Sequence, residues 1–160
     1  MKGSLVKGLM AITFLLMLPL SAKATGQTGD IIYIDGEKWS LLGKPLNYND
    51  ELYTKLNEFL PTDREWSTAN WSGYTGCWEI VYGRLYLKEV IAYIYDDILK
   101  IHYEVTYDAN DLKELFAPYY TVHGISAEWY SNKAVTAGRG ECIRYIHDAY
   151  DRNYAEELVM

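Results

Sequence analysis

The chain has few of the residues on which most catalytic and metal sites depend. Its 160 residues include only two cysteines, three histidines and four prolines. The histidines form no HxH, HExxH or HxxE arrangement, and neither a GxSxG nucleophile elbow nor a phosphate-binding glycine loop is present. Asp96-Asp97 and similar acidic pairs are sequence neighbours, whereas a two-carboxylate glycosidase holds its acids roughly 5–9.5 Å apart across a cleft. The sequence therefore indicates no cofactor and no metal, and favours a non-enzymatic protein over an enzyme.

A long hydrophobic run is missing after residue 24. Before it, a lysine-containing start precedes an apolar stretch from 9 to 20 and a small-x-small site that ends at Ala24. A bilayer span needs about 20 apolar residues, so this pattern predicts a signal peptide over 1–24 rather than a membrane anchor. We expect an exported protein, periplasmic or secreted, without stable membrane insertion after signal cleavage, and one domain over 25–160.

Basic residues are outnumbered, with 15 Lys and Arg against 22 Asp and Glu and a net charge of −7. Loss of the three lysines before residue 25 would take the net charge to −10. A strongly acidic protein repels phosphate backbones and anionic lipid, which excludes nucleic acid as a favoured partner. A basic partner or a neutral ligand stays open.

The two cysteines, Cys77 and Cys142, lie in no CxxC motif and beside no histidine. Paired thiols in exported proteins are usually oxidised, so we predict a Cys77–Cys142 disulfide rather than a catalytic thiol.

Hydrophobic periodicity and turn residues predict an α+β fold, mainly an antiparallel sheet of hairpins with one or two short helices packed on it. Asp35-Gly36 lies between two apolar runs and predicts a hairpin. Asn49 or Asp50 caps a helix over about 50–60. We also predict a half-buried strand over 98–107, with His102 on its polar face, and a short helix within 108–120. Two strands are expected around a turn at Ser131-Asn132. Residues 142–160 fit either a hairpin or a helix, and we favour the hairpin.

The segment "NWSGYTGCWEIVYGRLYLKEVI", residues 70 to 91, predicts a second hairpin with Tyr82-Gly83 as its turn. This register places Val81 opposite Arg84 and Cys77 opposite Lys88. One face then forms the core, with Tyr74, Trp78, Ile80, Leu85, Leu87 and Ile91. Glu79 falls on the other face beside Arg84 and Lys88, which is typical of a solvated ion pair rather than of a catalytic acid. Asn70-Trp71-Ser72 is formally a glycosylation sequon.

Two blocks of the sequence resemble an uncharacterised family of bacterial proteins. In that pattern a Trp-x-Gly-Tyr segment precedes a Trp-Glu-Ile strand, a glycine turn and a Leu-Tyr-Leu strand, and a later Trp-aromatic segment leads to a Tyr-x-His strand. The matching residues are Trp71, Gly73, Tyr74, Trp78, Glu79, Ile80, Gly83, Leu85, Tyr86, Leu87, Trp129, Tyr130, Tyr145, His147, Tyr150 and Tyr154. Ser72 replaces a residue that is often basic in this pattern, and glycines expected near Asn132 and Ala149 are missing. The resemblance implies one compact fold and no known activity.

Sixteen tyrosines and five tryptophans are the most abundant functional signal in the chain. Aromatic side chains stack on sugars and anchor protein partners, so we predict a binding or interaction protein for an unknown protein or glycan of the cell envelope. The candidate binding residues are Trp71, Tyr74, Trp129, Tyr130 and His147. Two alternatives are an immunity-like or inhibitor protein against a basic partner, and an envelope hydrolase that uses His147 or His123 with Asp148 or Glu128.

Overall fold

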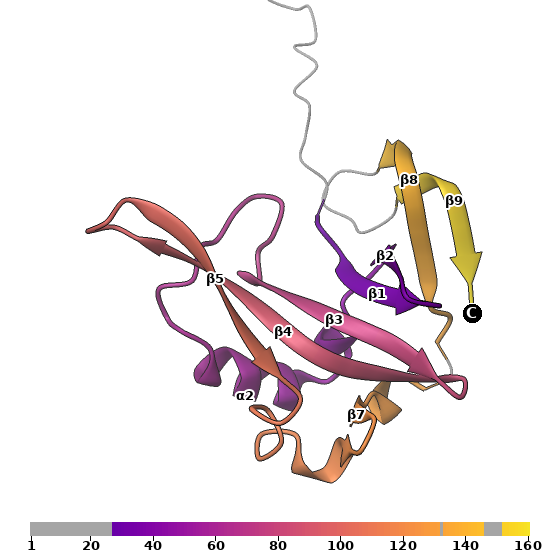
Figure 1. The fold of residues 1–160 in the computed structure, drawn as a ribbon, viewed down its shortest axis with the longest axis horizontal. Helices are drawn as coiled ribbons and strands as arrows, with labels where there is room; N and C mark the ends of the chain where they lie inside the picture. The colour runs from indigo at the N-terminus through magenta and orange to yellow at the C-terminus, as the bar shows by residue number, and fades with distance from the viewer. Residues whose placement is uncertain (1–26, 132, 146–151) are drawn as a thin grey trace, which may run out of the picture.

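A nine-stranded sheet dominates a computed structural model of the chain, which describes residues 27–131, 133–145 and 152–160 (Figure 1). The strands are β1 (Asp30–Ile34), β2 (Glu37–Leu41), β3 (Tyr74–Val81), β4 (Arg84–Asp96), β5 (Ile101–Asp108), β6 (Tyr120–Thr121), β7 (Gly124–Ser126), β8 (Thr136–Tyr145) and β9 (Arg152–Val159). Their order is β6-β7-β4-β3-β1-β2-β8-β9, and β5 pairs with β4. All pairs are antiparallel except β1 with β3. The predicted mainly antiparallel, strand-rich fold is therefore confirmed.

One α-helix, α2 (Asp50–Phe59), lies in the described part of the chain, together with the short 3-10 helices η1 (Pro45–Tyr48), η2 (Ala117–Tyr119) and η3 (Glu128–Tyr130). The side-chain oxygen of Asn49 accepts a hydrogen bond from the Leu52 amide at 3.1 Å, which confirms the predicted cap. Leu52 and Leu56 are buried on the inner face of α2, and Leu60 follows them into the core. None of the described helices is long and apolar enough to cross a membrane.

The hairpin turns predicted at Asp35-Gly36 and at Tyr82-Gly83 are confirmed. The central residues Asp35 and Gly36 have φ of 51° and 81°, and Tyr82 and Gly83 have φ of 51° and 74°. Positive φ at both central residues is the geometry of a type I′ turn, whose twist matches that of the flanking strands. The β1–β2 and β3–β4 hairpins thus form where the sequence predicts them.

The predicted register of the β3–β4 hairpin is correct from Val81 opposite Arg84 down to Trp78 opposite Leu87. Beyond that pair it is wrong, because Cys77 lies opposite Glu89 and not opposite Lys88. Lys88 is the extra residue of a β-bulge, and an extra residue in one strand reverses which side chains face inward. Consequently Ile91, a predicted core residue, is half-buried, and the strand continues the core with Val90, Ala92 and Ile94.

The predicted disulfide is absent. Cys77 is buried in β3 and Cys142 is exposed in β8, and the two sulfurs are not bonded to each other. Strands β1 and β2 lie between β3 and β8. Three strand spacings amount to about 14 Å, whereas a disulfide requires Cα atoms within about 7 Å. The parallel pairing of β1 with β3, which the sequence does not reveal, separates the cysteines.

Three other predictions need correction. The segment after β5 forms turns and then η2 instead of a second α-helix. The two strands predicted around Ser131 do not form a hairpin, because η3 occupies Glu128–Tyr130 directly before Ser131. The nearest strands, β7 and β8, pair with different partners. Strand β5 is half-buried only at Val105 and Tyr107, because Ile101 and Tyr103 extend beyond the body of the sheet.

The C-terminal segment forms an antiparallel pair, β8 with β9, so the hairpin prediction for 142–160 is confirmed over the helix alternative. Strand β8 begins at Thr136, earlier than predicted. A turn predicted over 150–153 is wrong at Arg152 and Asn153, which belong to β9 and pair with Tyr145 and Arg144. His147 and Tyr150 lie outside the described residues.

The main core joins the β3–β4 hairpin to α2 and to the turns that follow β5, which lie on one side of that hairpin (Figure 1). Trp78, Leu87, Leu56, Leu112 and Phe116 are almost completely buried there. Burying a side chain of this size stabilises the fold by roughly 1.5–3 kcal/mol. This packing fixes the strand ends and loops from which the candidate site is built.

Candidate ligand-binding site

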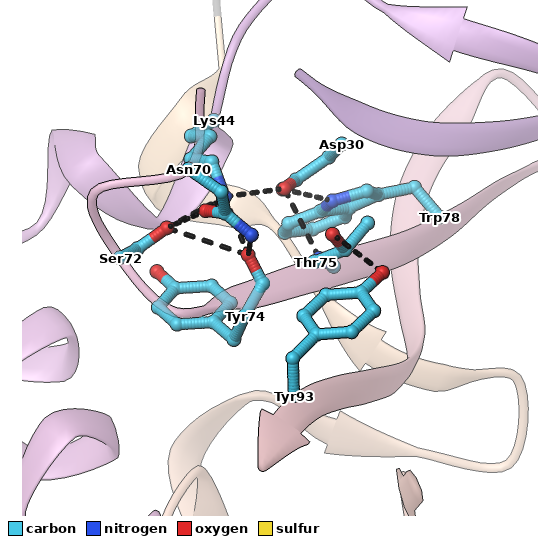
Figure 2. Close-up of polar contacts among 9 residues, drawn as sticks. Asp30, Lys44, Asn70, Ser72, Tyr74, Thr75, Trp78 and Tyr93 are labelled. Atoms are coloured by element: carbon cyan, nitrogen blue, oxygen red, sulfur yellow. Dashed lines mark hydrogen bonds and ion pairs between the residues drawn. The ribbon is translucent and has the colours of Figure 1, made fainter. Parts of the chain in front are cut away.

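A buried ion pair between Asp30 and Lys44 lies where β1, β3 and two loops meet (Figure 2). The Asp30 carboxylate oxygen and the Lys44 Nζ atom are 3.4 Å apart, and both side chains are almost completely buried. Asp30 also accepts hydrogen bonds from the Gly76 amide at 3.0 Å and from Trp78 Nε1 at 2.8 Å. Burial raises the pKa of Asp30, while Lys44 and the two N–H donors act to lower it.

Lys44 also donates hydrogen bonds to oxygen atoms of the loop before β3 and of Tyr74, the first residue of β3. Its Nζ atom donates to Ser72 Oγ and to the Tyr74 carbonyl, each at 2.7 Å, and lies 4.6 Å from the centre of the Tyr74 ring. Asn70 joins the same cluster, since its Nδ2 atom donates to the Tyr74 carbonyl at 3.1 Å. The side-chain amide of Asn70, which would be the glycosylation site of the formal sequon, therefore donates a hydrogen bond within the protein. This cluster of hydrogen bonds positions the loop before β3.

A pocket of about 930 Å³ lies beside the turn between β3 and β4. This volume falls within the range of small-molecule pockets, roughly 300–1,000 Å³. The turn and strand ends contribute Ile80, Gly83, Arg84 and Leu85, and the segment from β7 to β8 contributes the rest together with Met160. Those further lining residues are Ser126, Ala127, Glu128, Tyr130, Ser131, Lys133 and Val135. The backbone of Met160 is held in place by two hydrogen bonds to Val135, at 2.9 and 3.0 Å.

The chemistry of this pocket is mixed. Ile80, Leu85, Ala127, Val135 and Met160 provide apolar surface, and Ser126, Tyr130 and Ser131 provide hydroxyl groups. Arg84 and Lys133 are the two cations of the lining, against one carboxylate from Glu128. Counting side chains alone, the lining thus has one positive charge in excess, on a protein whose net charge is negative. Such a site suits a ligand with an apolar body and a negatively charged group.

A second hollow of about 320 Å³ lies next to the buried cluster. It is lined by Thr28, Glu65, Ser67, Ala69, Asn70, Thr75 and Tyr93. The Tyr93 hydroxyl donates to Thr75 Oγ1 at 3.2 Å, which closes part of its floor (Figure 2). This hollow has about a third of the volume of the first pocket.

The structure does not bring the predicted binding residues together. Of the four that the structure describes, Tyr130 lines the pocket of about 930 Å³, whereas Trp71 is 54% exposed on a separate loop and Tyr74 is buried beneath Lys44. Trp129 donates from Nε1 to the Pro45 carbonyl at 3.0 Å and packs on Phe116 and Tyr119 in the core. His147 lies outside the described residues.

Sequence reasoning missed Arg84, Leu85 and Lys133 as lining residues. The sequence predicts Arg84 on the charged face of the hairpin and Leu85 in the core, against which Leu85 does pack. The pattern within one hairpin does not show which other segments adjoin it. The pocket that these residues line forms only when β7, η3 and the start of β8 fold against the end of the hairpin. The predicted ion pair between Glu79 and Lys88 is confirmed, at 3.2 Å with both side chains partly exposed.

A scan against family models, a search of curated proteins and a search of solved structures each found no match. The resemblance to an uncharacterised bacterial family therefore stays a prediction. Among the residues that the structure describes, no group of three or more His, Cys, Asp and Glu side chains is placed to hold a metal ion.

Proposed function

We propose that this protein is an exported, non-enzymatic binding protein and that the pocket beside the β3–β4 turn is its binding site. The observation that carries the proposal is the combination, in one pocket of about 930 Å³, of an apolar wall, hydroxyl groups and two cations. Ligand sites are typically mostly apolar hollows with a few polar groups that fix the orientation of the ligand.

The cations favour one class of ligand. Arg84 and Lys133 attract a negatively charged group, and the apolar wall removes the rest of the ligand from water. An amphipathic anion, or an apolar protein segment flanked by acidic residues, meets both requirements. The pocket thus favours an acidic partner over the basic partner that the net charge suggests.

Anilinonaphthalene sulfonate is a suitable probe, because it joins an apolar ring system to a negative charge. We expect its fluorescence to rise on binding to the wild-type chain and the Leu85→Trp variant, in which an indole fills the pocket, to bind it roughly tenfold or more weakly. Ile143→Trp is the matched control, since Ile143 is 70% exposed on β8 and does not line the pocket. Equal binding by both tryptophan variants would refute the assignment of the pocket.

A further inference from the structure

The β4–β5 hairpin ends in an exposed apolar tip. Strand β3 pairs with β4 only as far as Ala92, so the hairpin continues beyond β3 and projects from the body of the protein (Figure 1). Ile98 is 91% exposed and Leu99 is 65% exposed at its end, and Ile101 and Tyr103 are close to half exposed beside them. Large apolar side chains gathered at one protruding point are typical of an interaction site.

The tip is held in a defined shape. One oxygen of Asp96 accepts hydrogen bonds from the Ile98 amide at 2.9 Å and from the Leu99 amide at 2.8 Å. Lys100 pairs with Asp97 at 2.6 Å, and the rings of Tyr95 and His102 are in contact across the strands, with centroids 4.8 Å apart. A tip fixed in this way presents its apolar side chains to a partner at a low cost in conformational entropy.

The charges at the tip are opposite to those of the pocket. Residues 96 to 104 contain three carboxylates and one lysine, and that lysine is already paired within the tip. The pocket lining contains two cations and one carboxylate around an apolar wall. An apolar segment flanked by acidic residues is therefore present on this same chain.

A single chain cannot place its own tip in its own pocket. Arg84 lines the pocket at the first residue of β4, and Asp96 is the last residue of the same strand. Twelve residue steps at about 3.4 Å each separate them by about 40 Å along a continuous strand. The complementary surfaces lie at opposite ends of the molecule and can meet only between two copies.

We propose that the β4–β5 tip of one copy docks into the pocket beside the β3–β4 turn of a second copy. This inference rests on the proposed function, because it names the occupant of the same pocket. The contact is heterologous, head to tail, so each copy has one surface of each kind and the assembly grows into a ring or an open chain. Its small size places it among weak interfaces, below about 1,200 Å² of buried surface.

Sedimentation velocity on the full chain, from micromolar concentrations to about 1 mM, tests the proposal. We expect the wild type to form larger species as its concentration rises. The Ile98→Ser/Leu99→Ser tip variant and the Leu85→Trp pocket variant should each associate at least about tenfold more weakly. Because each variant keeps one intact surface, an equimolar mixture of the two should form one-to-one dimers and nothing larger.

Two further variants test whether weaker association comes from misfolding or from a general loss of exposed apolar surface. Arg84→Glu alters an exposed pocket residue without changing the core, and should weaken association as Leu85→Trp does. Val122→Ser removes an equally exposed apolar side chain, 95% exposed in the turn between β6 and β7, and should associate like the wild type.

Each contrary outcome overturns the docking proposal. A wild type that stays monomeric at about 1 mM refutes it, and continued binding of anilinonaphthalene sulfonate would then leave the proposed function standing. If the tip variant associated as strongly as the wild type, the contact between copies would not involve the tip and would be assigned to the exposed edges of the sheet. Binding of the tip to phosphatidylcholine vesicles, with no self-association, would assign it to a lipid surface.

Discussion

At the scale of single residues, Cys77 shows most clearly how the fold sets chemistry. Its side chain is 1% exposed, and burial together with the nearby Glu89 carboxylate raises the pKa of the thiol to about 12. The thiolate is the reactive form of cysteine, so Cys77 is inert at neutral pH in the folded protein. Cys142, on the exposed part of β8, has no such protection from solvent.

We expect iodoacetamide to alkylate Cys142 in the native protein and to reach Cys77 only after unfolding. Peptide mapping by mass spectrometry measures both sites in one experiment. Detection of a peptide that joins the two cysteines would contradict the strand order between β3 and β8. Equal labelling of both in the native state would contradict the burial of Cys77.

The raised pKa of the Cys77 thiol also makes the free energy of unfolding fall as the pH rises. The folded-state pKa of about 12 lies above the ordinary value of 9.0, so the folded state keeps the proton that the unfolded state loses between these values. The stability that the buried, protonated Cys77 thiol contributes is therefore fully present below pH 9.0, and it is lost as the pH rises towards about 12. The free energy of unfolding of the wild type, relative to Cys77→Ala, should fall across that interval, as measured by urea denaturation.

At the scale of elements, the Asp30–Lys44 pair holds separate parts of the chain together. Asp30 begins β1 and bonds to Gly76 and Trp78 of β3, while Lys44 follows β2 and bonds to the loop before β3. The four contacts around Lys44 and Asp30 satisfy charges that would otherwise be buried alone, which is costly.

We expect Asp30→Asn and Lys44→Met each to lower the free energy of unfolding by about 3–5 kcal/mol, because each leaves a buried partner without its counterpart. The double variant should lose clearly less than the sum of the two, since no unpaired charge remains in it. Urea denaturation of the four proteins in this cycle measures the coupling. Additive losses would show that the two side chains act independently.

The sequence predicted the elements that depend on neighbours along the chain. Asp35-Gly36 and Tyr82-Gly83 specify their turns, and Asn49 specifies the start of α2, because turn and cap chemistry is local. The bulge at Lys88 escaped prediction, since an extra residue is visible only when the partner strand is known. The order of strands between Cys77 and Cys142 was missed for the same reason, as parallel pairing of β1 with β3 brings together distant segments.

The candidate site was predicted less well than the fold. Aromatic abundance predicts Trp71, Tyr74, Trp129, Tyr130 and His147 as binding residues. Of the four that the structure describes, Tyr130 alone lines the pocket of about 930 Å³. Aromatic side chains serve cores as readily as binding sites, as the packing of Trp129 on Phe116 illustrates. Composition alone does not separate these two uses.

At the scale of the whole molecule, β4 links the two surfaces that we assign to binding. Its first residue, Arg84, lines the pocket, and its last residue, Asp96, shapes the exposed tip. The docking proposal pairs the two cationic side chains of the pocket with the carboxylates of the tip. The pocket draws its lining from β3, β4, the segment from β7 to β8 and Met160, so it exists only in the complete fold.

The most direct test of the central claim is a map of ligand contacts by amide NMR. Isotope-labelled tip variant, Ile98→Ser/Leu99→Ser, is titrated with anilinonaphthalene sulfonate so that self-association plays no part. We expect the largest chemical-shift changes at Arg84, Ala127 and Val135, around the pocket beside the β3–β4 turn. Changes centred instead on Ser67, Thr75 and Tyr93, around the smaller hollow, would contradict the claim.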